Sequence, residues 1–418
     1  MILEYDNFEN KCSRTQCRSC RELGLKPILD FGLMPLSDGL LSEDLLSKQE
    51  GMYPLELVFC PACSLVQILE TVPPETLFCD DYPYYSSFSD FLLEHSRNNV
   101  LSLIEKRKLG PDSFVVELAS NDGYLLRNYV EKGIPCLGID PAEGPAREAE
   151  KVGVPTMCTF FTEDVARQLV SRGRRTDVIH ANNVLAHVAD TNGFVEGISI
   201  LLKDKGVAVV EVPYVRDMID HCEFDTIYHE HLCYFSVTAL DRLFRRHKLF
   251  LNDIQHLAIH GGSLRLFVSP YEEVLESVRK ILEEERETGV DKYEYYTSFS
   301  KKVRNVREKM QRLLQDLKSK GKNIAAYGAA AKGAIMLNYI EADTDIINFV
   351  VDRNVHKQGK YMPGRHIPIC DPARLMKDMP DYVLILPWNF KDEILSQQAP
   401  FRARGGKFII PIPEPVIV

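Results

Sequence analysis

The chain has 418 residues and a formal net charge of −10 at pH 7. This length exceeds what one hydrophobic core usually serves, so we expect several domains. The acidic balance argues against a nucleic acid polymer as the main partner, because such binders usually carry a basic patch. No apolar run reaches the ~18 residues of a membrane helix, and residues 1–6 lack the pattern of a signal peptide. We therefore expect a cytoplasmic protein that acts on small molecules, without a membrane partner.

Four cysteines form two pairs near the N-terminus. Cys17-Arg-Ser-Cys20 and Cys60-Pro-Ala-Cys63 each place two thiols on a tight turn, and two such turns complete a tetrahedral zinc shell. The eleven cysteines are an odd count, which favours thiols and metal ligands over a disulfide framework. Because all four positions are cysteine, we expect a structural Zn²⁺. The alternatives are redox pairs, ordinary buried thiols, or Cys12 in place of Cys17.

An aromatic and hydroxyl-rich stretch, residues 81–88, follows this module. We predict that Tyr82 in this stretch lines the substrate site, the alternative being a seam between domains. Residues 91–101 then repeat apolar side chains at helical spacing, which predicts a helix.

From residue 114 the pattern alternates between strands and helices. It predicts a buried strand at 114–118, a turn at 119–123, a helix at 124–132 and a second strand that ends in Asp140. An acid at that position accepts both ribose hydroxyls in dinucleotide-binding folds. The turn lacks Gly-x-Gly-x-x-Gly and is flanked by carboxylates, which repel a pyrophosphate but attract the charged groups of S-adenosylmethionine (SAM). The unit therefore favours SAM over NAD, and the alternative is a Rossmann unit without a nucleotide.

Ligands of open α/β sheets bind outside the carboxyl ends of the strands. Further strands are predicted at 177–180 and 206–213, and polar residues follow the first of them. The predicted cofactor-binding residues are Glu117, Ser120, Asn121, Asp122, Gly123, Asp140, Asn182 and Asn183. His187 follows the same strand, so we expect it in the active site rather than as a structural histidine. The pattern of residues 260–268 predicts a strand that follows a glycine-containing hairpin turn. The alternative is that these glycines let a ligand approach the backbone closely.

The densest set of proton-transfer groups is the run Tyr228-His229-Glu230-His231. Two imidazoles, a carboxyl group and a phenol stand side by side between apolar residues. A helical turn would put Tyr228 and His231 on one face, whereas a strand would pair His229 with His231. We predict a catalytic centre here, and the alternatives are a solvated polar turn or a metal site.

The C-terminal part begins with charged helical patterns over residues 271–320, which predict a helical connector. A second α/β pattern follows, with strands predicted at 324–327, 346–352 and 382–387. The glycine-rich turn Gly328-Ala-Ala-Ala-Lys-Gly333 offers backbone N–H groups and the cation Lys332, which suits a diphosphate. We predict that Tyr327 and Lys332 bind substrate, and the alternative is a Rossmann-like domain without a ligand.

Together these motifs resemble the zinc-containing, SAM-dependent sugar C-methyltransferases, in order over nearly the whole chain. Ala119 departs from the glycine expected in many relatives. The resemblance implies a three-domain α/β chain with a zinc module at 1–78, a class I Rossmann-like methyltransferase domain at 79–270, the connector at 271–320 and a Rossmann-like nucleotide-sugar domain at 321–418. The stretches that carry it, besides the cysteine pairs, are Met34-Pro-Leu36, Tyr53-Pro-Leu55, Glu117-Leu-Ala-Ser-Asn-Asp-Gly123, Phe224-Asp-Thr-Ile-Tyr-His-Glu-His231 and Tyr327-Gly-Ala-Ala-Ala-Lys-Gly333.

The resemblance also implies a reaction: methyl transfer from SAM to a ring carbon, C3, of a nucleotide-linked 4-keto-6-deoxy sugar in branched deoxysugar biosynthesis. It implies His231 as the base, with Tyr228, Glu230 and His187 around the sugar and Asp140 at the SAM ribose. We predict that His229 binds substrate, and it is the alternative base. The chemistry is consistent, because a C4 ketone acidifies the neighbouring carbon and a base with hydrogen-bond donors can then form an enolate.

Two other functions compete with this one. The C-terminal glycine turn could bind NAD in a nucleotide-sugar dehydrogenase or epimerase, or the chain could be a non-catalytic zinc-ribbon interaction protein. The sequence leaves open the sugar, its nucleotide, the stereochemistry and the oligomeric state.

Overall fold

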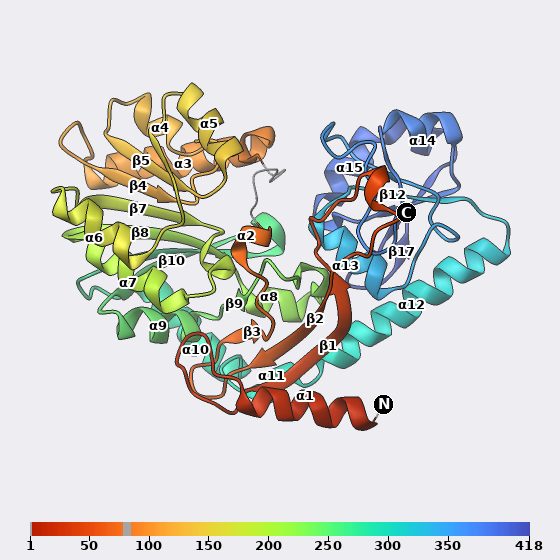
Figure 1. Cartoon of the computed structure of the whole chain (residues 1–418), viewed down its shortest axis with the longest axis horizontal. Helices are drawn as coiled ribbons and strands as arrows, with labels where there is room; N and C mark the ends of the chain where they lie inside the picture. Colours follow the sequence, from red (N-terminus) through yellow and green to blue (C-terminus); the bar gives the residue numbers. More distant parts are fainter. Residues whose placement is uncertain (1, 78–84) are drawn as a thin grey trace.

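The computed structural model describes residues 2–77 and 85–418, and within them the strands form three sheets (Figure 1). The sheets have four, seven and six strands. Figure 1 shows the seven-stranded sheet and the six-stranded sheet on opposite sides, with the four-stranded sheet below and between them. Among these residues no helix is both long and apolar enough to cross a membrane. The predicted domain boundaries at 78, 270 and 320 stay predictions.

The four-stranded sheet is antiparallel, with the order β1-β2-β3-β9. Its inner strand β2 packs into the core, where its apolar side chains Leu55, Leu57 and Val58 are fully buried. Its last strand, β9, comes from a distant part of the sequence, directly after the Tyr228–His231 run. The run is therefore held between this sheet and the central one. The elements are α1 (Ile2–Arg14), β1 (Lys26–Pro35), β2 (Met52–Phe59), β3 (Val66–Ile68), α2 (Pro74–Leu77) and β9 (Cys233–Tyr234).

The central sheet has the order β10-β11-β8-β7-β4-β5-β6, with β8 to β6 parallel and β10 and β11 antiparallel. Helices α3 and α4 bury one face, and α6 and α7 bury the other. The strand order reverses beside β4, which places a ligand crevice at the carboxyl ends of β4, β5 and β7. The strands are β4 (Val115–Leu118), β5 (Cys136–Asp140), β6 (Thr156–Cys158), β7 (Thr176–Asn182), β8 (Leu202–Pro213), β10 (Phe250–Leu257) and β11 (Ser263–Ser269).

Of the two helices predicted in this part, one is confirmed and one differs in length. The helix predicted at 91–101 is confirmed as α3, and the hairpin before 268 is confirmed as β10–β11. The helix predicted at 124–132 is wrong in length, because regular α-helix covers only α4 and hydrogen-bonded turns flank it. The helices are α3 (Asp90–Arg107), α4 (Arg127–Val130), α5 (Glu143–Lys151), α6 (Glu163–Ser171), α7 (Thr191–Leu201), α8 (Val215–Asp220) and α9 (Val237–Arg246), with 3₁₀ turns η2 (Ser86–Phe88), η3 (Leu185–His187) and η4 (Phe224–Thr226).

The C-terminal sheet has the order β14-β13-β12-β15-β16-β17, and only β17 pairs antiparallel. The strand predicted at 346–352 is shorter than expected, because residues 343–347 close hydrogen-bonded turns before the chain extends. The elements are β12 (Ile324–Tyr327), α13 (Ala331–Tyr339), β13 (Val350–Val351), β14 (Ile369–Cys370), α14 (Ala373–Asp378), β15 (Tyr382–Ile385), α15 (Lys391–Gln397), α16 (Ala399–Ala403), β16 (Lys407–Ile410) and β17 (Val416–Ile417).

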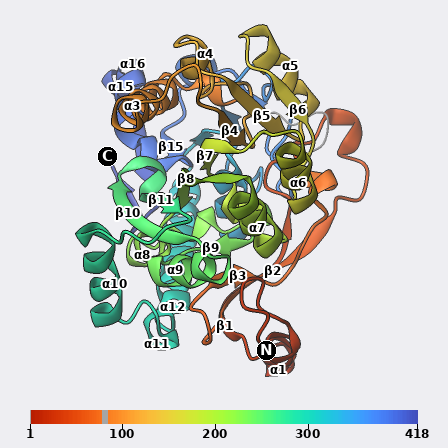
Figure 2. The same cartoon turned by 90° about the vertical axis from the view of Figure 1, so that its left-hand side faces the viewer.

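The connector consists of α10 (Glu276–Thr288), α11 (Tyr293–Tyr296) and α12 (Phe299–Ser319). Gly289 ends α10 in the left-handed conformation, with φ 80°, as its predicted position between two helices requires. Helix α10 packs against α9 and β10 of the central part (Figure 2). Helix α12 runs from the lower part of the molecule to the C-terminal sheet (Figure 1).

The buried carboxylate of Glu285 joins the connector to the central domain. It lies on α10 and accepts hydrogen bonds from the Tyr214 hydroxyl (2.9 Å), from the backbone N–H groups of Val237 (2.7 Å) and Thr238 (2.8 Å), and from the Thr238 hydroxyl (2.6 Å). It therefore satisfies donors at the N-terminus of α9.

Replacing Glu285 by Gln should lower the free energy of unfolding by ~3 kcal/mol. The N–H₂ group of the amide cannot accept a hydrogen bond, so some of these buried N–H and O–H donors would lose their acceptor. Glu284→Gln, at a half-exposed ion pair with Arg216, is the matched control.

Urea denaturation of the two variants tests this role of Glu285. The control should change the free energy of unfolding by less than ~1 kcal/mol. Equal effects of both substitutions would contradict a role for the Glu285 cap.

Candidate active site

The Tyr228–His231 run is a hydrogen-bonded turn, closed by a bond from the His231 N–H to the Tyr228 carbonyl (2.9 Å). The turn brings the two side chains together, with ring centroids 4.1 Å apart and the Tyr228 hydroxyl 3.0 Å from His231 Nε2. On the other side of the ring, Nδ1 lies 2.9 Å from the Thr226 carbonyl oxygen. A carbonyl only accepts, so Nδ1 carries a proton, and in the neutral imidazole Nε2 then accepts from Tyr228. The geometry thus presents Nε2 as a base.

His187 lies beside this pair. Its ring meets that of His231 edge to face, with centroids 4.8 Å apart, and its imidazole donates to the main-chain carbonyl of Glu230. Desolvation lowers the pKa of His187 to about 4, so the imidazole is neutral near pH 7. The bond from the Leu232 N–H to the Ala186 carbonyl (2.8 Å) fixes the two segments together.

Glu230 and His229 occupy different surroundings. The buried carboxyl of Glu230 has a pKa well above its ordinary value, because desolvation and then the nearby charge of Asp38 disfavour ionisation. His229 is also buried, but its Nε2 lies 3.1 Å from the Pro54 carbonyl oxygen and its ring packs edge-on against Tyr53. Both of these contacts are to β2. The structure therefore places His229 against the zinc module, while its neighbours Tyr228 and His231 form a hydrogen-bonded pair.

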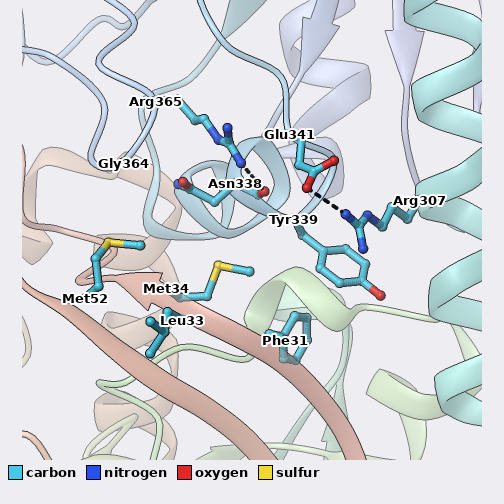
Figure 3. Close-up of a pocket in the computed structure, with 10 residues that line it drawn as sticks. All are labelled: Phe31, Leu33, Met34, Met52, Arg307, Asn338, Tyr339, Glu341, Gly364 and Arg365. Atoms are coloured by element: carbon cyan, nitrogen blue, oxygen red, sulfur yellow. Dashed lines mark hydrogen bonds and ion pairs between the residues drawn. The ribbon is translucent and has the colours of Figure 1, made fainter. Parts of the chain in front are cut away.

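The segment that supports His231 is packed between two domains. Phe224 in η4 contacts Phe31 of β1 (centroids 6.3 Å) and Tyr339 of α13 (5.3 Å), and Phe31 and Tyr339 also meet at 5.2 Å. Figure 3 shows Phe31 and Tyr339 in this place, beside a cavity of about 300 Å³ between β1 and α13. The η4 backbone that holds His231 Nδ1 is therefore fixed by residues of three sequence regions.

The predicted cofactor residues lie at the carboxyl ends of β4, β5 and β7. Asp140 accepts from the backbone N–H groups of Asn121 (2.8 Å) and Ala142 (2.9 Å), one on each oxygen. Each oxygen keeps a lone pair for a ribose hydroxyl. At the end of β7, Asn182 has a buried side-chain oxygen without a donor among the described residues, and Asn183 takes a φ of 53°. The structure thus places the predicted set at the carboxyl ends of neighbouring strands.

Buried carboxyl groups in this crevice fit the positive charges of SAM. Both oxygens of Glu117 are buried, and among the residues that the structure describes the donor beside them is the Tyr124 side chain. Desolvation, and then the charges of Asp140 and Asp122, raise the pKa of Glu117 well above its ordinary value. No lysine or arginine in the described chain forms an ion pair with these three carboxyl groups. A ligand with ammonium and sulfonium groups would neutralise them.

The backbone of the cofactor turn explains its sequence. Ala119 has a φ of 56°, in the left-handed region where glycine is favoured, which accounts for the glycine expected at this position. Gly123 has a φ of 75°. A Cβ on Gly138 of β5 would lie 2.4 Å from Ser120 Oγ, so the turn packs directly on a glycine of the next strand.

Sequence analysis missed the residues that cover this turn. The backbone N–H of Ser86 donates to the Asn121 side chain (2.8 Å), and that of Ser87 donates to Asp122 (3.1 Å). Phe88 stacks on His356 of the C-terminal part, with centroids 6.5 Å apart. Tyr82, predicted in the same stretch, lies outside the described residues. Ser86, Ser87 and Phe88 thus bridge the cofactor turn and the C-terminal domain, and the serines belong to no recognisable motif.

The C-terminal glycine turn is shorter than predicted, because only residues 328–330 lie between β12 and α13, which begins at Ala331. Gly328 has a φ of 90°, and a Cβ there would lie 2.4 Å from Pro387. The backbone N–H of Ala329 donates to Asp352 (2.7 Å), and the Lys332 ammonium donates to Asn389 (3.0 Å). A pocket of about 300 Å³ adjoins this end of the sheet. It is lined by Tyr327, Arg353, Pro372, Gln397 and Gln398.

Two buried acids of the central domain, Glu223 and Asp225, lie near Lys332. Asp225 accepts from the indole N–H of Trp388 (2.8 Å), the only tryptophan in the chain, and Lys332 lies over the Trp388 ring at 4.8 Å. Desolvation raises the pKa of Asp225 to about 6 and that of Glu223 to about 8, against the opposing charge of Lys332. Sequence analysis did not single out these acids, because their partners lie more than 100 residues away.

The raised pKa of Glu223 predicts a pH-dependent stability. Because its pKa rises from 4.5 to about 8 on folding, its contribution to stability is present below pH ~4.5 and is lost as the pH rises to about 8. The Glu223→Gln side chain does not ionise, so this variant does not lose stability at this position as the pH rises. Its melting temperature should match that of the wild type at pH 5 and exceed it at pH 8.5, with Trp388 fluorescence as the readout. A variant that is less stable than the wild type at both pH values would contradict this account.

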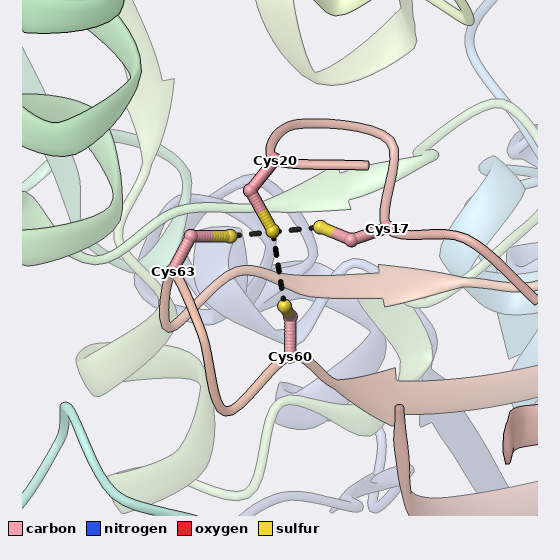
Figure 4. A group of neighbouring side chains, drawn as sticks. All are labelled: Cys17, Cys20, Cys60 and Cys63. Carbon is pink, nitrogen blue, oxygen red and sulfur yellow. Dashed lines mark hydrogen bonds between the residues drawn. The ribbon is translucent and has the colours of Figure 1, made fainter. Parts of the chain in front are cut away.

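The four predicted zinc ligands meet at one point (Figure 4). Their sulfur atoms lie within 4.8 Å of one another, with Cys17–Cys63 and Cys20–Cys60 at 3.5 Å. Tetrahedral thiolates bound at ~2.3 Å stand ~3.8 Å apart, so the set fits Zn²⁺ without rearrangement. Cys12 is buried but is not part of this group among the described residues, which favours Cys17 over Cys12 as the fourth ligand.

Comparisons with known proteins cover the three parts of the chain. A zinc-binding domain model matches residues 17–78, a methyltransferase domain model 93–249 and a C-methyltransferase C-terminal domain model 258–413. The chain is 34% identical over 406 residues to the C-methyltransferase NovU of Streptomyces niveus, with 96% of each chain covered.

Solved methyltransferases align with less than half of the chain. The magnesium protoporphyrin IX methyltransferase of Synechocystis PCC 6803 with bound SAM is 12% identical, with 43% of this chain and 82% of that chain covered and a TM-score of 0.33. The 1,6-didemethyltoxoflavin-N1-methyltransferase of Burkholderia thailandensis is 16% identical, with 49% and 94% covered and a TM-score of 0.35.

The near full-length match decides between the competing functions. It excludes the dehydrogenase, epimerase and non-catalytic alternatives, and it agrees with the cysteine cluster and the cofactor crevice. The chain belongs to the zinc-binding C-methyltransferase family and is a SAM-dependent C-methyltransferase.

Proposed function

We propose that the methyl acceptor is a ring carbon beside the ketone of a nucleotide-linked 4-keto-6-deoxy sugar, and that this carbon is C3. The observation that carries the proposal is the hydrogen-bonded series Tyr228–His231–Thr226, which orients the imidazole so that Nε2 is the basic atom of its neutral form. A carbon becomes nucleophilic only after it loses a proton, so a base of this kind is what C-methylation beside a ketone needs.

The catalytic roles of His231 and Tyr228 follow from their positions in this hydrogen-bonded series. His231 Nε2 takes the proton from C3, while Nδ1 keeps its bond to the Thr226 carbonyl. The Tyr228 hydroxyl leaves Nε2 when substrate arrives and donates to the ketone oxygen, where negative charge develops. His187, neutral and edge-on to His231, holds the plane of that ring. When bound, SAM supplies an electrophilic methyl group.

The remaining site residues divide between the two ligands. We assign the ribose of SAM to Asp140 and its cationic methionine end to Glu117 and Asp122, because these acids have no cation of their own in the described chain. Glu230 faces the sugar. His229 anchors the reactive turn to β2, and we therefore place His231, not His229, as the base. Tyr82 stays a prediction as a wall of the sugar site.

The C-terminal turn suits the nucleotide diphosphate. Backbone N–H groups at the start of α13 and the ammonium of Lys332 are suited to phosphate oxygens. The adjoining pocket, with Tyr327 on β12 and Arg353 after β13, has the volume and the polar lining for a base and its ribose. Binding there directs the sugar toward Lys332 and Asp225.

Isotopically labelled SAM tests the acceptor class. The enzyme is incubated with TDP-, GDP- and CDP-linked 4-keto-6-deoxy sugars and with their 4-hydroxy counterparts, and the products are followed by NMR. We expect one labelled methyl group, on C3, and only with 4-keto sugars. Methylation of the 4-hydroxy sugars would contradict the enolate route, and a methyl group on C5 would contradict the C3 assignment.

A further inference from the structure

The indole of Trp388 joins the C-terminal domain directly to the element that supports His231. Trp388 begins the 3₁₀ turn η6 (Trp388–Phe390), and its side-chain N–H donates to Asp225 Oδ2 at 2.8 Å. Asp225 belongs to η4 of the central domain and is fully buried. A buried carboxyl group of one domain is therefore held by a side-chain donor from another.

The η4 turn leaves little freedom between Asp225 and the carbonyl group that holds His231. The Thr226 N–H donates to the Glu223 carbonyl at 3.2 Å, and the Thr226 hydroxyl donates to the same carbonyl at 2.7 Å. Asp225 is covalently next to Thr226, whose carbonyl oxygen lies 2.9 Å from His231 Nδ1. A displacement of Asp225 would therefore displace the acceptor that orients His231.

The same tryptophan is fixed to the C-terminal glycine turn on its other side. Pro387, directly before Trp388, packs so closely on Gly328 that a Cβ there would lie 2.4 Å from the proline ring. The ammonium of Lys332 lies 4.8 Å from the centre of the indole ring and donates to Asn389, the next residue, at 3.0 Å. Trp388 thus lies between η4 and the turn that we assign to the diphosphate.

Apolar packing also holds η4, but it sets no direction. Phe224 contacts Phe31 and Tyr339, with centroids 6.3 and 5.3 Å apart. Such burial is non-directional, whereas a hydrogen bond needs its donor and acceptor within narrow ranges of distance and angle. Among the hydrogen bonds of the described residues, the bond from Trp388 to Asp225 is the one that joins η4 to the C-terminal domain.

We propose that Trp388 is a positioning residue, whose hydrogen bond to Asp225 fixes η4, and hence the ring of His231, relative to the glycine turn. This inference rests on the proposed function for the roles of His231 and of the glycine turn. It gives the C-terminal domain a part in proton transfer in addition to the binding of the nucleotide, because one domain then sets the position of both the sugar and the base.

Nitrogen-15 NMR of the histidine side chains, in the zinc-loaded full chain, tests the proposal without any sugar. The His231 signals are those that disappear in His231→Asn, and in the wild type the neutral ring should carry its proton on Nδ1. Trp388→Phe keeps an aromatic ring beside Lys332 but loses the N–H donor. It should lower the fraction of the Nδ1–H form about twofold or more, because the Thr226 carbonyl is no longer held in place.

Two substitutions of Asp225 test the other end of the bond. Asp225→Ala removes the acceptor and should lower the Nδ1–H fraction of His231 as Trp388→Phe does. Asp225→Asn keeps an oxygen acceptor and should stay close to the wild type. Phe390→Leu, at a partly exposed residue of the same η6 turn, is the matched control and should leave the fraction unchanged.

Turnover with a 4-keto sugar gives a second measurement. Trp388→Phe should lower kcat about tenfold and leave KM for the sugar within about threefold of the wild type, because the base is misplaced while the nucleotide site is kept. The double variant Trp388→Phe with Asp225→Ala should be no slower than the slower single variant, since both substitutions remove one interaction.

A lower Nδ1–H fraction in Trp388→Phe and Asp225→Ala, restored in Asp225→Asn, would support the proposal, since a merely structural role would not move the proton of His231 in this pattern. A wild-type fraction in both variants, or a rise in KM without a fall in kcat, would overturn it. If Trp388→Phe does not fold, the comparison of Asp225→Ala with Asp225→Asn decides. A failure of the proposed function is seen separately, as wild-type enzyme that methylates no 4-keto sugar, and the NMR measurement does not depend on that result.

Discussion

His231→Asn should lower turnover by about 100- to 10,000-fold, the usual effect of removing a general base. Asparagine can still donate to the Thr226 carbonyl and accept from Tyr228, but its amide oxygen is not basic enough to take a proton from carbon. The affinity for SAM, measured by calorimetry, should stay within about threefold of the wild type, since His231 lies outside the cofactor crevice.

His221→Asn provides the matched control for this substitution. That imidazole is largely exposed and lies 3.4 Å from Glu223, away from Tyr228. Its turnover should equal that of the wild type. Normal turnover in His231→Asn would remove His231 from the role of base, and a parallel loss of SAM binding would point to misfolding instead.

Cys60→Ser should abolish zinc binding and cause a larger loss of stability than Glu285→Gln. Structural zinc sites contribute on the order of 10 kcal/mol to folding. The consequence extends to the active site, because β3, which follows Cys63, pairs with β9 directly after His231. We expect a much lower melting temperature and the loss of methyl transfer, both reproduced in the wild type by a strong chelator.

Cys158→Ser is the control for the loss of a thiol, because Cys158 is exposed on β6 of the central sheet. Metal analysis should find one zinc per chain in the wild type and in Cys158→Ser, and none in Cys60→Ser. Full activity of a zinc-free Cys60→Ser protein would contradict the link between the module and the reactive turn.

Local patterns in the sequence predicted most of the fold. Each βαβ unit repeats apolar strand, turn and helix within about 30 residues, so the strands ending in Asp140 and at Tyr327 were recognisable from their neighbours alone. The cysteine pairs likewise specify their metal by local spacing. Element lengths were less accurate, as α4 and β13 show, because tertiary contacts end them.

The site was predictable only where its residues are adjacent in the chain. The sequence brings Tyr228 and His231 together, but it could not show that His229 turns toward β2, since a turn and a strand place the histidines differently. Trp388 was missed, because it reaches Asp225 from more than 100 residues away and belongs to no motif. Such contacts depend on how three domains pack, and no local spacing encodes that arrangement.

Deuterium exchange into the sugar tests the central claim most directly. The enzyme is incubated in heavy water with a nucleotide-linked 4-keto-6-deoxy sugar, first without SAM and then with it. The account predicts exchange at C3 that depends on His231, followed by a single methyl addition at the same carbon when SAM is present. Two results would contradict proton removal by His231. One is an enzyme that methylates the sugar with SAM but shows no exchange without SAM, and the other is exchange that persists in His231→Asn.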